Sequence, residues 1–340
     1  MTDNRKSIRL RDVALRAGVS TASVSRVLNR PNSVKTETRK RIEAAMAEMA
    51  YVPNWAARAL ASQKSLTVGA IVPTLGIAIF ASGVEALQDR LHELGYTLLL
   101  ASAQYDISKE LECARVLVER KVDGLVLVGG EHDPAMYQLI ETNGIPIVTT
   151  YVFTPETRFP SVGIDNAAAS RRVVQHLLDL GHREFGVLTS PLRANDRIRA
   201  RLDGMIACFA EHGIDLGKER ILEVNYSIQD GRRGFTRLRT SSPAITAVAC
   251  TTDALAIGCM LEADRMGLRI PQDVSITGFD DLELATEIKP GLTTIHVPAR
   301  ELGVRTADLL VAAIERRHVP DRVELTAELI LRGSSGRPPG

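Results

Sequence analysis

The chain has 340 residues, of which 45% are hydrophobic and 24% are charged. This composition excludes a disordered, collagen-like or disulfide-rich protein, and the length predicts two or three domains rather than one. The formal net charge is only +1. No stretch reaches the roughly 18 apolar residues of a spanning helix, and no apolar run of a signal peptide follows Met1 to Leu10. We therefore expect a cytoplasmic protein without a membrane partner.

The cysteines support the same compartment. They are scattered, and they form neither a C-x-x-C pair nor the spacing of a zinc site. The four are Cys113, Cys208, Cys250 and Cys259. This pattern favours a reducing cytoplasm.

The charge is distributed unevenly along the chain. Residues 1–64 carry 13 Lys and Arg against 5 Asp and Glu, a balance of +8. The rest carries 29 against 36, a balance of −7. A basic first segment on an acidic remainder indicates nucleic acid as a partner, although charge alone leaves a merely solvated surface as the alternative.

The segment from Leu10 to Asn29 predicts two short helices that share one small core. Apolar residues recur at helical spacing in both halves, at Val13, Ala14, Ala17, Val24, Val27 and Leu28. Gly18 between them can take the positive φ that ends a helix, and Ser20 can cap the next one. This layout is a helix-turn-helix.

Two further helices are predicted after it. The first has one apolar face, formed by Ile42, Ala45, Met46 and Met49. Its start is ambiguous because Lys35 stands where a capping side chain is expected, so Thr36 is the alternative cap. The second begins at Asn54 as N-cap and is only about eight residues long, which is too short to be stable alone in water.

The run from Leu10 to Leu60 resembles the DNA-binding head of the lactose-repressor (LacI/GalR) family. The matching motifs are Asp-Val-Ala, Ala-Gly-Val-Ser, Val-Ser-Arg-Val-Leu-Asn, Thr-Arg-Lys-Arg-Ile, Tyr-Val-Pro-Asn and Ala-Arg-Ala-Leu. In the family the second helix lies in the major groove, and the resemblance places Thr21, Ala22 and Arg26 against base edges. Arg26 would be the strong reader, because a guanidinium can donate two hydrogen bonds to guanine O6 and N7.

The resemblance also implies residues that contact phosphates and fix the register on DNA. These are Ser23, Ser25, Asn29, Thr38 and Tyr51, although each alone could be an ordinary cap or turn residue. Asn54 is a further expected DNA contact. The short helix that begins there corresponds to the family's hinge helix. Leu60 corresponds to the leucine that wedges into the minor groove at the operator centre. The expected division is a head at 1–53 and a hinge helix with linker at 54–64.

Beyond Ser65 the chain alternates strands and helices, the pattern of parallel sheets with helical crossovers. The predicted strands are Leu66 to Val72, Tyr96 to Ala101, Gly124 to Val128, Ile145 to Thr149, Ser161 to Ile164, Glu184 to Leu188, Ile221 to Val224, Ala247 to Cys250, Val274 to Thr277 and Thr293 to His296. Ten such units need two sheets.

This segment resembles the family's periplasmic-binding-protein-like body, in which two Rossmann-like lobes enclose a cleft. The expected fold is therefore a small all-α head joined to an α/β body. We expect the amino-terminal lobe at 65–164 and 292–320, and the carboxyl-terminal lobe at 165–291 and 321–333. A flexible tail is expected at 334–340, and the absence of a leucine heptad there disfavours a tetramerising coiled coil.

No catalytic constellation is evident in the body. Neither a phosphate loop nor a serine elbow nor a metal motif occurs, so we expect no cofactor, no metal and no enzymatic activity. His182 is interpreted as the C-cap of a helix. Asp253, Asp280 and Asp281 follow predicted strand ends, where open α/β sheets bind ligands, and ligand binding or capping explains them better than catalysis.

Family positions that line the effector cleft are only partly typical here. Asp280, in Gly-Phe-Asp-Asp, would accept hydrogen bonds from ligand hydroxyls, and Arg201, in Arg-Leu-Asp-Gly, would donate from the other side. Thr252 replaces the usual asparagine, and Thr74 stands where aspartate is common. Phe80 is the one aromatic residue retained in its segment.

The arginines around the start of the cleft helix do not decide whether the ligand is neutral or anionic. Arg193, Arg197, Arg199 and Arg201 cluster there with Asn195, and Arg197 and Arg201 would share a helical face. Either Asp196, Asp203 or Asp280 neutralises them, or they bind a carboxylate on the effector, as in a sugar acid.

Together these features predict a homodimeric, effector-controlled regulator, expected to be a repressor, that binds a palindromic operator. A sugar or sugar acid in the cleft would control its DNA affinity through the hinge. An enzyme or a plain solute-binding protein built on the same body is the alternative. An enzyme would need a set of catalytic residues, which the sequence does not show. A solute-binding protein would have no need of the basic head.

Overall fold

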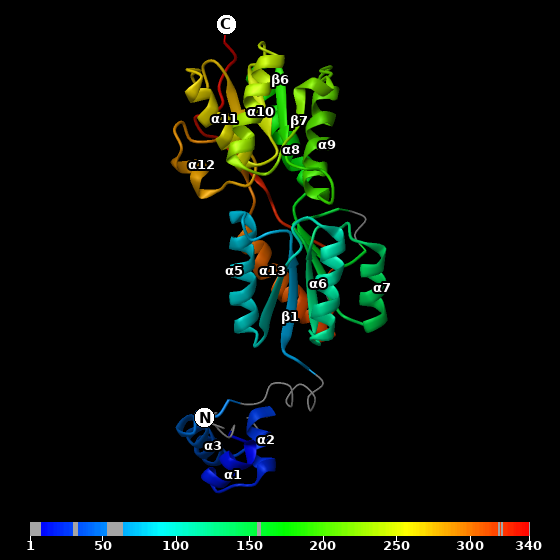
Figure 1. Cartoon of the computed structure of the whole chain (residues 1–340), viewed down its shortest axis with the longest axis vertical. Coiled ribbons are helices and arrows are strands. Elements are labelled where there is room, and N and C mark those ends of the chain that lie inside the picture. Colours follow the sequence, from blue (N-terminus) through cyan, green and yellow to red (C-terminus); the bar gives the residue numbers. More distant parts are fainter. Residues whose placement is uncertain are drawn as a thin grey trace, which may run out of the picture. The chain divides into compact units, whose positions relative to one another are not determined.

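A computed structural model of the chain describes residues 8–29, 33–52, 64–154, 158–318, 320 and 322–339. The chain forms two compact units, which divide after Leu66 (Figure 1). The first unit is the head, and the second, from Thr67 onward, is the body.

The head consists of three helices around one apolar core. They are α1 (Leu10–Ala17), α2 (Thr21–Asn29) and α3 (Thr36–Glu48). Gly18 ends α1 with φ 62°, and the Ser20 hydroxyl accepts the Ser23 amide at 3.2 Å at the start of α2. The buried residues of its core are Val13, Ala14, Ala17, Val24, Val27, Ile42 and Ala45. The predicted helix-turn-helix is confirmed.

The start of α3 corrects one expectation. Thr36 is the first helical residue and Lys35 is the N-cap, with no side-chain hydrogen bond to the helix end. The hinge helix expected from Asn54 cannot be assessed, because 53–63, including Asn54 and Leu60, lie outside the described residues.

The first sheet of the body has six parallel strands in the order β11-β5-β4-β3-β1-β2. Their bounds are β1 (Thr67–Val72), β2 (Thr97–Ser102), β3 (Gly124–Val128), β4 (Ile147–Thr150), β5 (Ser161–Gly163) and β11 (Arg322–Glu324). One face is covered by α5 (Ala78–Glu93) and α13 (Ala299–Ile314), and the other by α6 (Ile107–Glu119) and α7 (Pro134–Asn143) (Figure 1). This is the amino-terminal lobe.

The carboxyl-terminal lobe contains a second parallel sheet in the order β7-β6-β8-β9. Its strands are β6 (Phe185–Thr189), β7 (Ile221–Glu223), β8 (Ala247–Cys250) and β9 (Ser275–Thr277). Helices α8 (Asn166–Asp179) and α9 (Asp196–Glu211) cover one face, and α10 (Ile228–Ser241) and α11 (Asp253–Arg265) cover the other. Short helices lie at Lys218–Arg220 and at α12 (Glu283–Glu287), and β10 (Thr294–His296) pairs with β12 (Glu328–Ile330).

All ten predicted strands are present, with bounds shifted by at most two residues. The lobe boundaries need two corrections. β11, expected in the carboxyl-terminal lobe within 321–333, pairs with β5 in the first sheet. β10, expected in the amino-terminal lobe within 292–320, lies beside the second sheet, where the preceding Thr293 bridges to Thr277 and His296 bridges to Asp280. Strands of three residues carry too little periodicity to assign a lobe.

The tail expected to be flexible at 334–340 is instead docked against the second sheet at Ser334 and Gly336. Ser334 is buried, and its hydroxyl donates to the Ile276 carbonyl at 2.6 Å. The Gly336 carbonyl lies 2.8 Å from His182 Nε2. The His182 side chain therefore anchors the tail. The predicted capping of a helix falls to its backbone amide, which donates to the Leu177 carbonyl at the end of α8 at 3.2 Å.

No helix in the described part of the chain is both long enough and apolar enough to span a bilayer.

Candidate functional site

The exposed face of α2 gathers the residues predicted to read bases. Thr21, Ala22 and Arg26 are exposed to solvent. Val24 and Val27, on the opposite face, are buried against α1 and α3. Because the buried positions fix the rotation of the helix, the three exposed side chains are presented together to a partner.

The residues predicted to contact phosphates are partly buried around that helix. Ser23 and Ser25 lie on α2, Thr38 lies in the first turn of α3, and Tyr51 packs against the head core. Asn29 is the last residue of α2, and its side chain lies outside the described set. The structure thus places four of these five side chains near the reading helix. Contacts from them to DNA phosphates would set the register of that helix on the duplex.

The second candidate site is a cavity of about 20 Å³ between the lobes, at the carboxyl ends of the strands. This is room for one or two water molecules. It is lined by Ile77, Ile79, Phe80, Tyr105, Tyr151, Asn195, Arg197, Ile198, Arg201, Tyr226, Thr252 and Asp280. Five of the six residues predicted for the effector cleft are among them. The sixth, Thr74, is turned toward its own loop, where its hydroxyl accepts the Gly76 amide at 3.0 Å.

Arg201 is held in place from several directions. It is buried on α9, and its Nε donates to Asn166 Oδ1 at 2.9 Å. Its Nη1 donates to the Thr251 carbonyl at 2.9 Å and to Asp280 Oδ1 at 3.1 Å. The guanidinium also stacks 3.6 Å above the centre of the Phe279 ring. Such a group presents a fixed charge to the cleft at little cost in ordering.

Asp280 is the carboxylate on the other side of this ion pair. Its second oxygen accepts the Tyr226 hydroxyl at 3.0 Å. Burial raises the pKa of Asp280, while Arg201 and the Tyr226 hydroxyl act in the opposite direction. The backbone at Asp280 has φ 123°, a strained value for a residue other than glycine and one often found at binding sites.

Arg197 has its own counter-charge. Asn195 caps α9 by accepting the Ile198 amide, and Arg197 lies in the first turn with Nη1 3.0 Å from Asp196 Oδ1. Together with the Arg201–Asp280 pair, this leaves both cleft arginines neutralised by protein carboxylates. Of the two explanations for the arginine cluster, the contacts therefore support neutralisation.

Thr252 contributes an unused hydroxyl. The residue is fully buried, it lines the cleft, and its Oγ1 has no hydrogen-bond partner among the described residues. A buried hydroxyl without a partner is uncommon in folded proteins. It is a ready donor or acceptor for a bound molecule.

The predicted carboxylate cluster divides into three roles. Only Asp280 lines the cavity. Asp253 accepts the Leu282 amide at 2.8 Å and the Thr294 hydroxyl at 2.5 Å, so it ties α11 to the chain that leaves the second sheet. Asp281 forms an ion pair with Arg332, and its other carboxylate oxygen lies 2.9 Å from His296 Nδ1. Capping and tethering thus account for two of the three.

Three aromatic residues of the cleft were missed by the sequence analysis. Tyr105, Tyr151 and Tyr226 each follow the carboxyl end of a strand, namely β2, β4 and β7. The rule that open α/β sheets bind ligands at these ends would have selected them.

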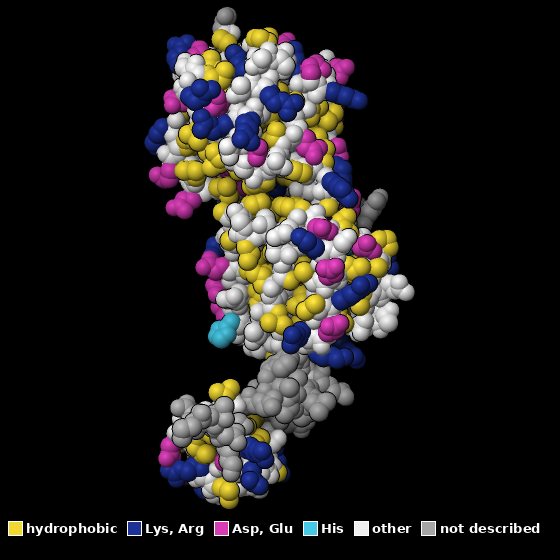
Figure 2. Space-filling view, viewed as in Figure 1, with side chains coloured by type: hydrophobic (Ala, Val, Ile, Leu, Met, Phe, Trp, Pro, Cys, Tyr) yellow, Lys and Arg dark blue, Asp and Glu magenta, His cyan; other side chains and the backbone are white. Residues whose placement is uncertain are grey.

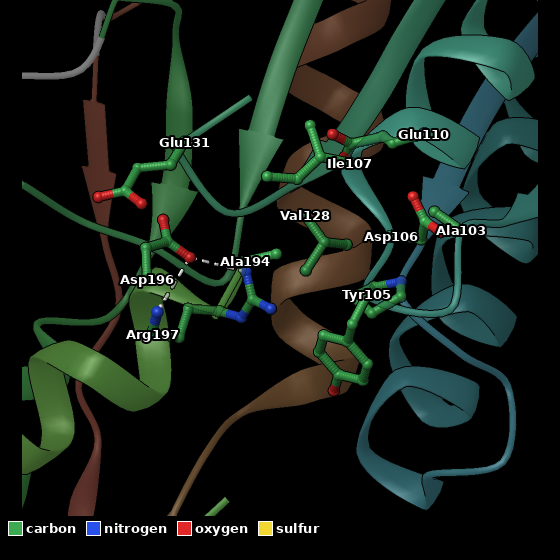
Figure 3. A pocket seen from close by; sticks show the side chains of 11 residues that line it. Ala103, Tyr105, Asp106, Ile107, Glu110, Val128, Glu131, Ala194, Asp196 and Arg197 are labelled. Atoms are coloured by element: carbon green, nitrogen blue, oxygen red, sulfur yellow. Dashed lines mark hydrogen bonds and ion pairs between the residues drawn. The ribbon is translucent and has the colours of Figure 1, made fainter. Parts of the chain in front are cut away.

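A second cavity, of about 30 Å³, adjoins the first and shares Tyr105 and Arg197 with it. Figure 3 shows Asp196 and Arg197 of α9 on one side of it and Asp106 and Glu110 on the other. The cleft therefore extends past Tyr105 toward a wall rich in carboxylates.

This arrangement is suited to binding. In the part of the chain that the structure describes, no group of three or more His, Cys, Asp or Glu is placed to hold a metal ion. The cleft combines apolar walls with a few fixed polar groups, which is the usual composition of a small-molecule site.

Comparison with known proteins covers both units. Residues 9–54 match the family described as bacterial regulatory proteins, lacI family, and residues 174–335 match a periplasmic binding protein-like domain. The HTH-type transcriptional repressor PurR of Escherichia coli O1:K1 is 34% identical over 328 residues, which cover 96% of each chain. The PurR of Shigella dysenteriae serotype 1 is equally similar.

Solved structures with a similar fold cover nearly the whole chain. The lac repressor dimer bound to operator and the anti-inducer ONPF superposes with a TM-score of 0.87 at 28% identity, covering 97% of this chain and all of that one. A LacI family protein from Silicibacter pomeroyi gives a TM-score of 0.88 at 26% identity with the same coverage. The CelR–cellobiose complex gives 0.70 at 27% identity, covering 96% of this chain and 99% of that one.

Proposed function

The chain belongs to the lacI family of bacterial regulatory proteins, which are DNA-binding transcriptional repressors and other regulators, and we propose that it represses its targets as an effector-controlled homodimer on a palindromic operator. A small metabolite in the body cleft would change the affinity for DNA. The observation that carries this proposal is the pairing of an exposed reading helix with a separate unit whose two lobes enclose a cleft of apolar walls and a few fixed polar groups.

The reading of bases is assigned to Arg26. Arg26→Ala should cost on the order of 1 to 3 kcal/mol in operator binding and relax the preference at one base pair of each half-site, because the bidentate contact to guanine is lost. Selection from a random duplex library, followed by sequencing, measures this preference.

The matched control is Arg11→Ala, which removes an exposed arginine from α1. It should lower affinity for all duplexes alike, since an electrostatic contact carries no sequence information. An Arg26→Ala protein that selects the same bases as the unmodified protein contradicts the assignment.

The effector is proposed to be a sugar or sugar acid. Phe80, Tyr105 and the isoleucines of the wall offer apolar faces, while Asp280 and Thr252 offer hydrogen bonds to hydroxyl groups. The structurally similar CelR was solved as a complex with cellobiose. Since both cleft arginines are paired with carboxylates, a neutral sugar is favoured over a sugar acid.

Calorimetric titration with panels of neutral sugars and of sugar acids distinguishes these ligands. Whichever sugar or sugar acid gives heat is then titrated into Arg201→Lys. This variant should lose most of the affinity despite its charge, because an ammonium cannot replace the planar donors that hold Asn166, Asp280 and the Thr251 carbonyl. If neither panel gives heat while operator binding is intact, the effector class is wrong and the regulator assignment stands.

The body also offers a surface for a second copy of the chain. β2 is an edge strand of the first sheet, and Leu99 and Leu100 on it are more than a third exposed. Figure 2 shows apolar side chains gathered on one face of this lobe. Exposed apolar edges are normally covered in solution, and the similar lac repressor is a dimer.

A further inference from the structure

Two stretches of chain that belong to different lobes meet beside the cleft. The Gly130 amide, in the loop that follows β3, donates to Asp196 Oδ2 in the first turn of α9 at 2.6 Å. Glu131 forms an ion pair with Arg199 of the same helix. Figure 3 shows Glu131 and Asp196 on the same side of the second cavity. The amino-terminal lobe is thus bonded directly to the carboxyl-terminal lobe at this edge of the cleft.

The Asp196 carboxylate serves both lobes at once. Its Oδ1 accepts the backbone amide of Arg197 at 2.9 Å and lies 3.0 Å from Nη1 of that arginine, within the carboxyl-terminal lobe. Its Oδ2 is bonded to Gly130 in the other lobe. The carboxyl ends of parallel strands are the places where open α/β sheets bind ligands. Asp196 therefore occupies, at the end of β3, a position that an oxygen of a ligand could take.

The two stretches fit together closely. Gly129 has φ +97°, and a Cβ there would lie 2.4 Å from Arg197 Nη1 and 2.8 Å from Asp196 Oδ1. On the side of α9, Ala194 has φ 54°, a left-handed value that alanine rarely adopts. Backbone in such conformations persists where the surrounding contacts hold it in place. The closed arrangement of the lobes is therefore specified by the contacts at this point.

In this closed arrangement the cleft is too small for the proposed effector. The two cavities that share Tyr105 and Arg197 measure about 20 and 30 Å³, which is room for a few water molecules. A sugar needs a considerably larger enclosed volume. Because the lobes touch through Asp196, a sugar can enter only after they separate there.

The two bonds between the lobes differ in strength. The Glu131 and Arg199 side chains are 65% and 37% exposed, so solvent screens their attraction. The Asp196 side chain is 14% exposed, and its bond to Gly130 has a charged acceptor, which makes it the stronger of the two. The closed arrangement therefore depends mainly on Asp196.

We propose that Asp196 is an internal latch: its carboxylate holds the lobes closed by accepting the Gly130 amide, and an effector reaches the cleft only when this bond breaks. Asp196 is a positioning residue, because it acts on the arrangement of the lobes. The inference deepens the proposed function, on which it rests only for the identity of the molecule that enters the cleft.

Pulsed electron spin resonance measures the opening of the full-length protein without a ligand. Spin labels are attached at Gln138→Cys on α7 and Ala210→Cys on α9, two exposed positions in different lobes. The chain also carries Cys113→Ser, since the other three cysteines are buried. Labelled chains are diluted with unlabelled ones, so that distances within one chain are measured. Asp196→Ala should raise the ratio of open to closed molecules by at least about tenfold, because a hydrogen bond to a charged group is lost.

Asp203→Ala is the matched control. It removes the same charge from an exposed position of the same helix and should leave the ratio unchanged. Asp196→Asn should open the body less than Asp196→Ala does, since an amide oxygen can still accept the Gly130 amide. A folded Asp196→Ala protein with the same distances as Asp203→Ala would overturn the proposal.

Amide exchange read by NMR in the unmodified protein is a second test, which does not depend on the folding of a variant. The Gly129 amide donates to the Thr150 carbonyl at 3.0 Å within the amino-terminal lobe, and it serves as the internal reference. The Gly130 amide should exchange at least about tenfold more slowly than its intrinsic rate. Exchange of Gly130 at the intrinsic rate, while Gly129 stays protected, would also contradict the latch. Neither test uses DNA or a sugar, so failure of the proposed function would leave both results readable.

Discussion

Single carboxylates in this body have different tasks although they occupy similar places in the sequence. Asp253 and Asp280 both follow strands of the second sheet, and both are buried. Asp280 faces Arg201 and the cleft, whereas Asp253 accepts hydrogen bonds from an amide and a hydroxyl. A buried carboxylate with neutral partners only is costly to ionise. The contacts, and not the position after a strand, therefore decide which group binds and which group supports.

Asp253 should make stability depend on pH. Burial, with a smaller effect of Asp280, raises the pKa of Asp253 to about 7, from an ordinary value of 3.8. The folded protein thus holds a proton that the unfolded chain has lost between these two values. The free energy of unfolding should therefore fall as the pH rises from about 4 to 7, by up to about 1.4 kcal/mol per unit, and the loss should level off above 7. Urea unfolding at a series of pH values measures this slope.

Asp253→Asn should flatten the slope. An asparagine can accept the Leu282 amide and donate to Thr294, whose hydroxyl can turn to accept, so the fold should be retained. Asp264→Asn, at an exposed site on the same helix, is the control and should leave the slope unchanged. A steep slope that survives in Asp253→Asn would assign the pH dependence to other groups.

Much of the cleft could be predicted from residues that stand in recognisable motifs, and less from those that do not. Arg201, Asp280 and Thr252 were found because they stand in motifs whose spacing is visible in the chain. Thr74 was misplaced because a side chain near a strand end can equally bond its own loop. Asn166 orients Arg201 from another helix start, a relation that no local pattern reveals.

At the level of elements, helix pairs in the body pack closely through glycine. On α13, a Cβ at Gly303 would lie 2.2 Å from the Gly83 carbonyl oxygen of α5. On α9, one at Gly204 would lie 2.4 Å from the Ala167 carbonyl oxygen of α8. Both neighbours are backbone atoms, which cannot turn aside as a side chain can. The spacing of these helices therefore depends on the absence of a methyl group.

Gly303→Ala should destabilise the amino-terminal lobe although alanine favours helices. The added methyl group forces α13 away from α5, which we expect to cost about 1 to 3 kcal/mol, more than the roughly 1 kcal/mol gained in helix propensity. Chemical denaturation measures the difference. Arg305→Ala, an exposed site on the same helix, should change stability by less than about 0.5 kcal/mol. A Gly303→Ala protein as stable as the unmodified one would show that the helices can separate without cost.

Strands with buried side chains were easier to predict from the sequence than strands with exposed ones. Strands such as β3, Gly-Leu-Val-Leu-Val, are buried on both faces and read as continuous apolar runs. β11, Arg-Val-Glu, and β12, Glu-Leu-Ile, have three residues each and only partly buried side chains, so they gave no signal. The tail after Arg332 has the composition of a linker, yet hydrogen bonds to β9 hold it in place. The Ile276 amide donates to the Ser334 carbonyl, and the Gly336 amide donates to the Ser275 hydroxyl. Such pairing is tertiary and has no local signature.

At the scale of the whole molecule, the chain combines two units that fold around separate cores. The buried cluster of the head lies within residues 13–45, and the buried apolar residues of the body begin at Val68. The basic excess belongs to the first 64 residues and the acidic excess to the remainder. An acidic body repels the DNA that a basic head attracts, which keeps non-specific contacts confined to the head.

Deletion of residues 1–64 should therefore remove DNA binding and leave the body otherwise unaffected. Ser65 is kept because it is buried. The truncated chain should remain a dimer in sedimentation, since the exposed edge strand β2 belongs to the body, and its thermal midpoint should match that of the body in the full chain. Gel retardation at physiological salt should show no specific complex, because the remaining charge is about −7 and no reading helix is present. A truncated body that still retarded one duplex over others would place sequence recognition outside the head, and a monomeric body would show that the dimer is held by the first 64 residues.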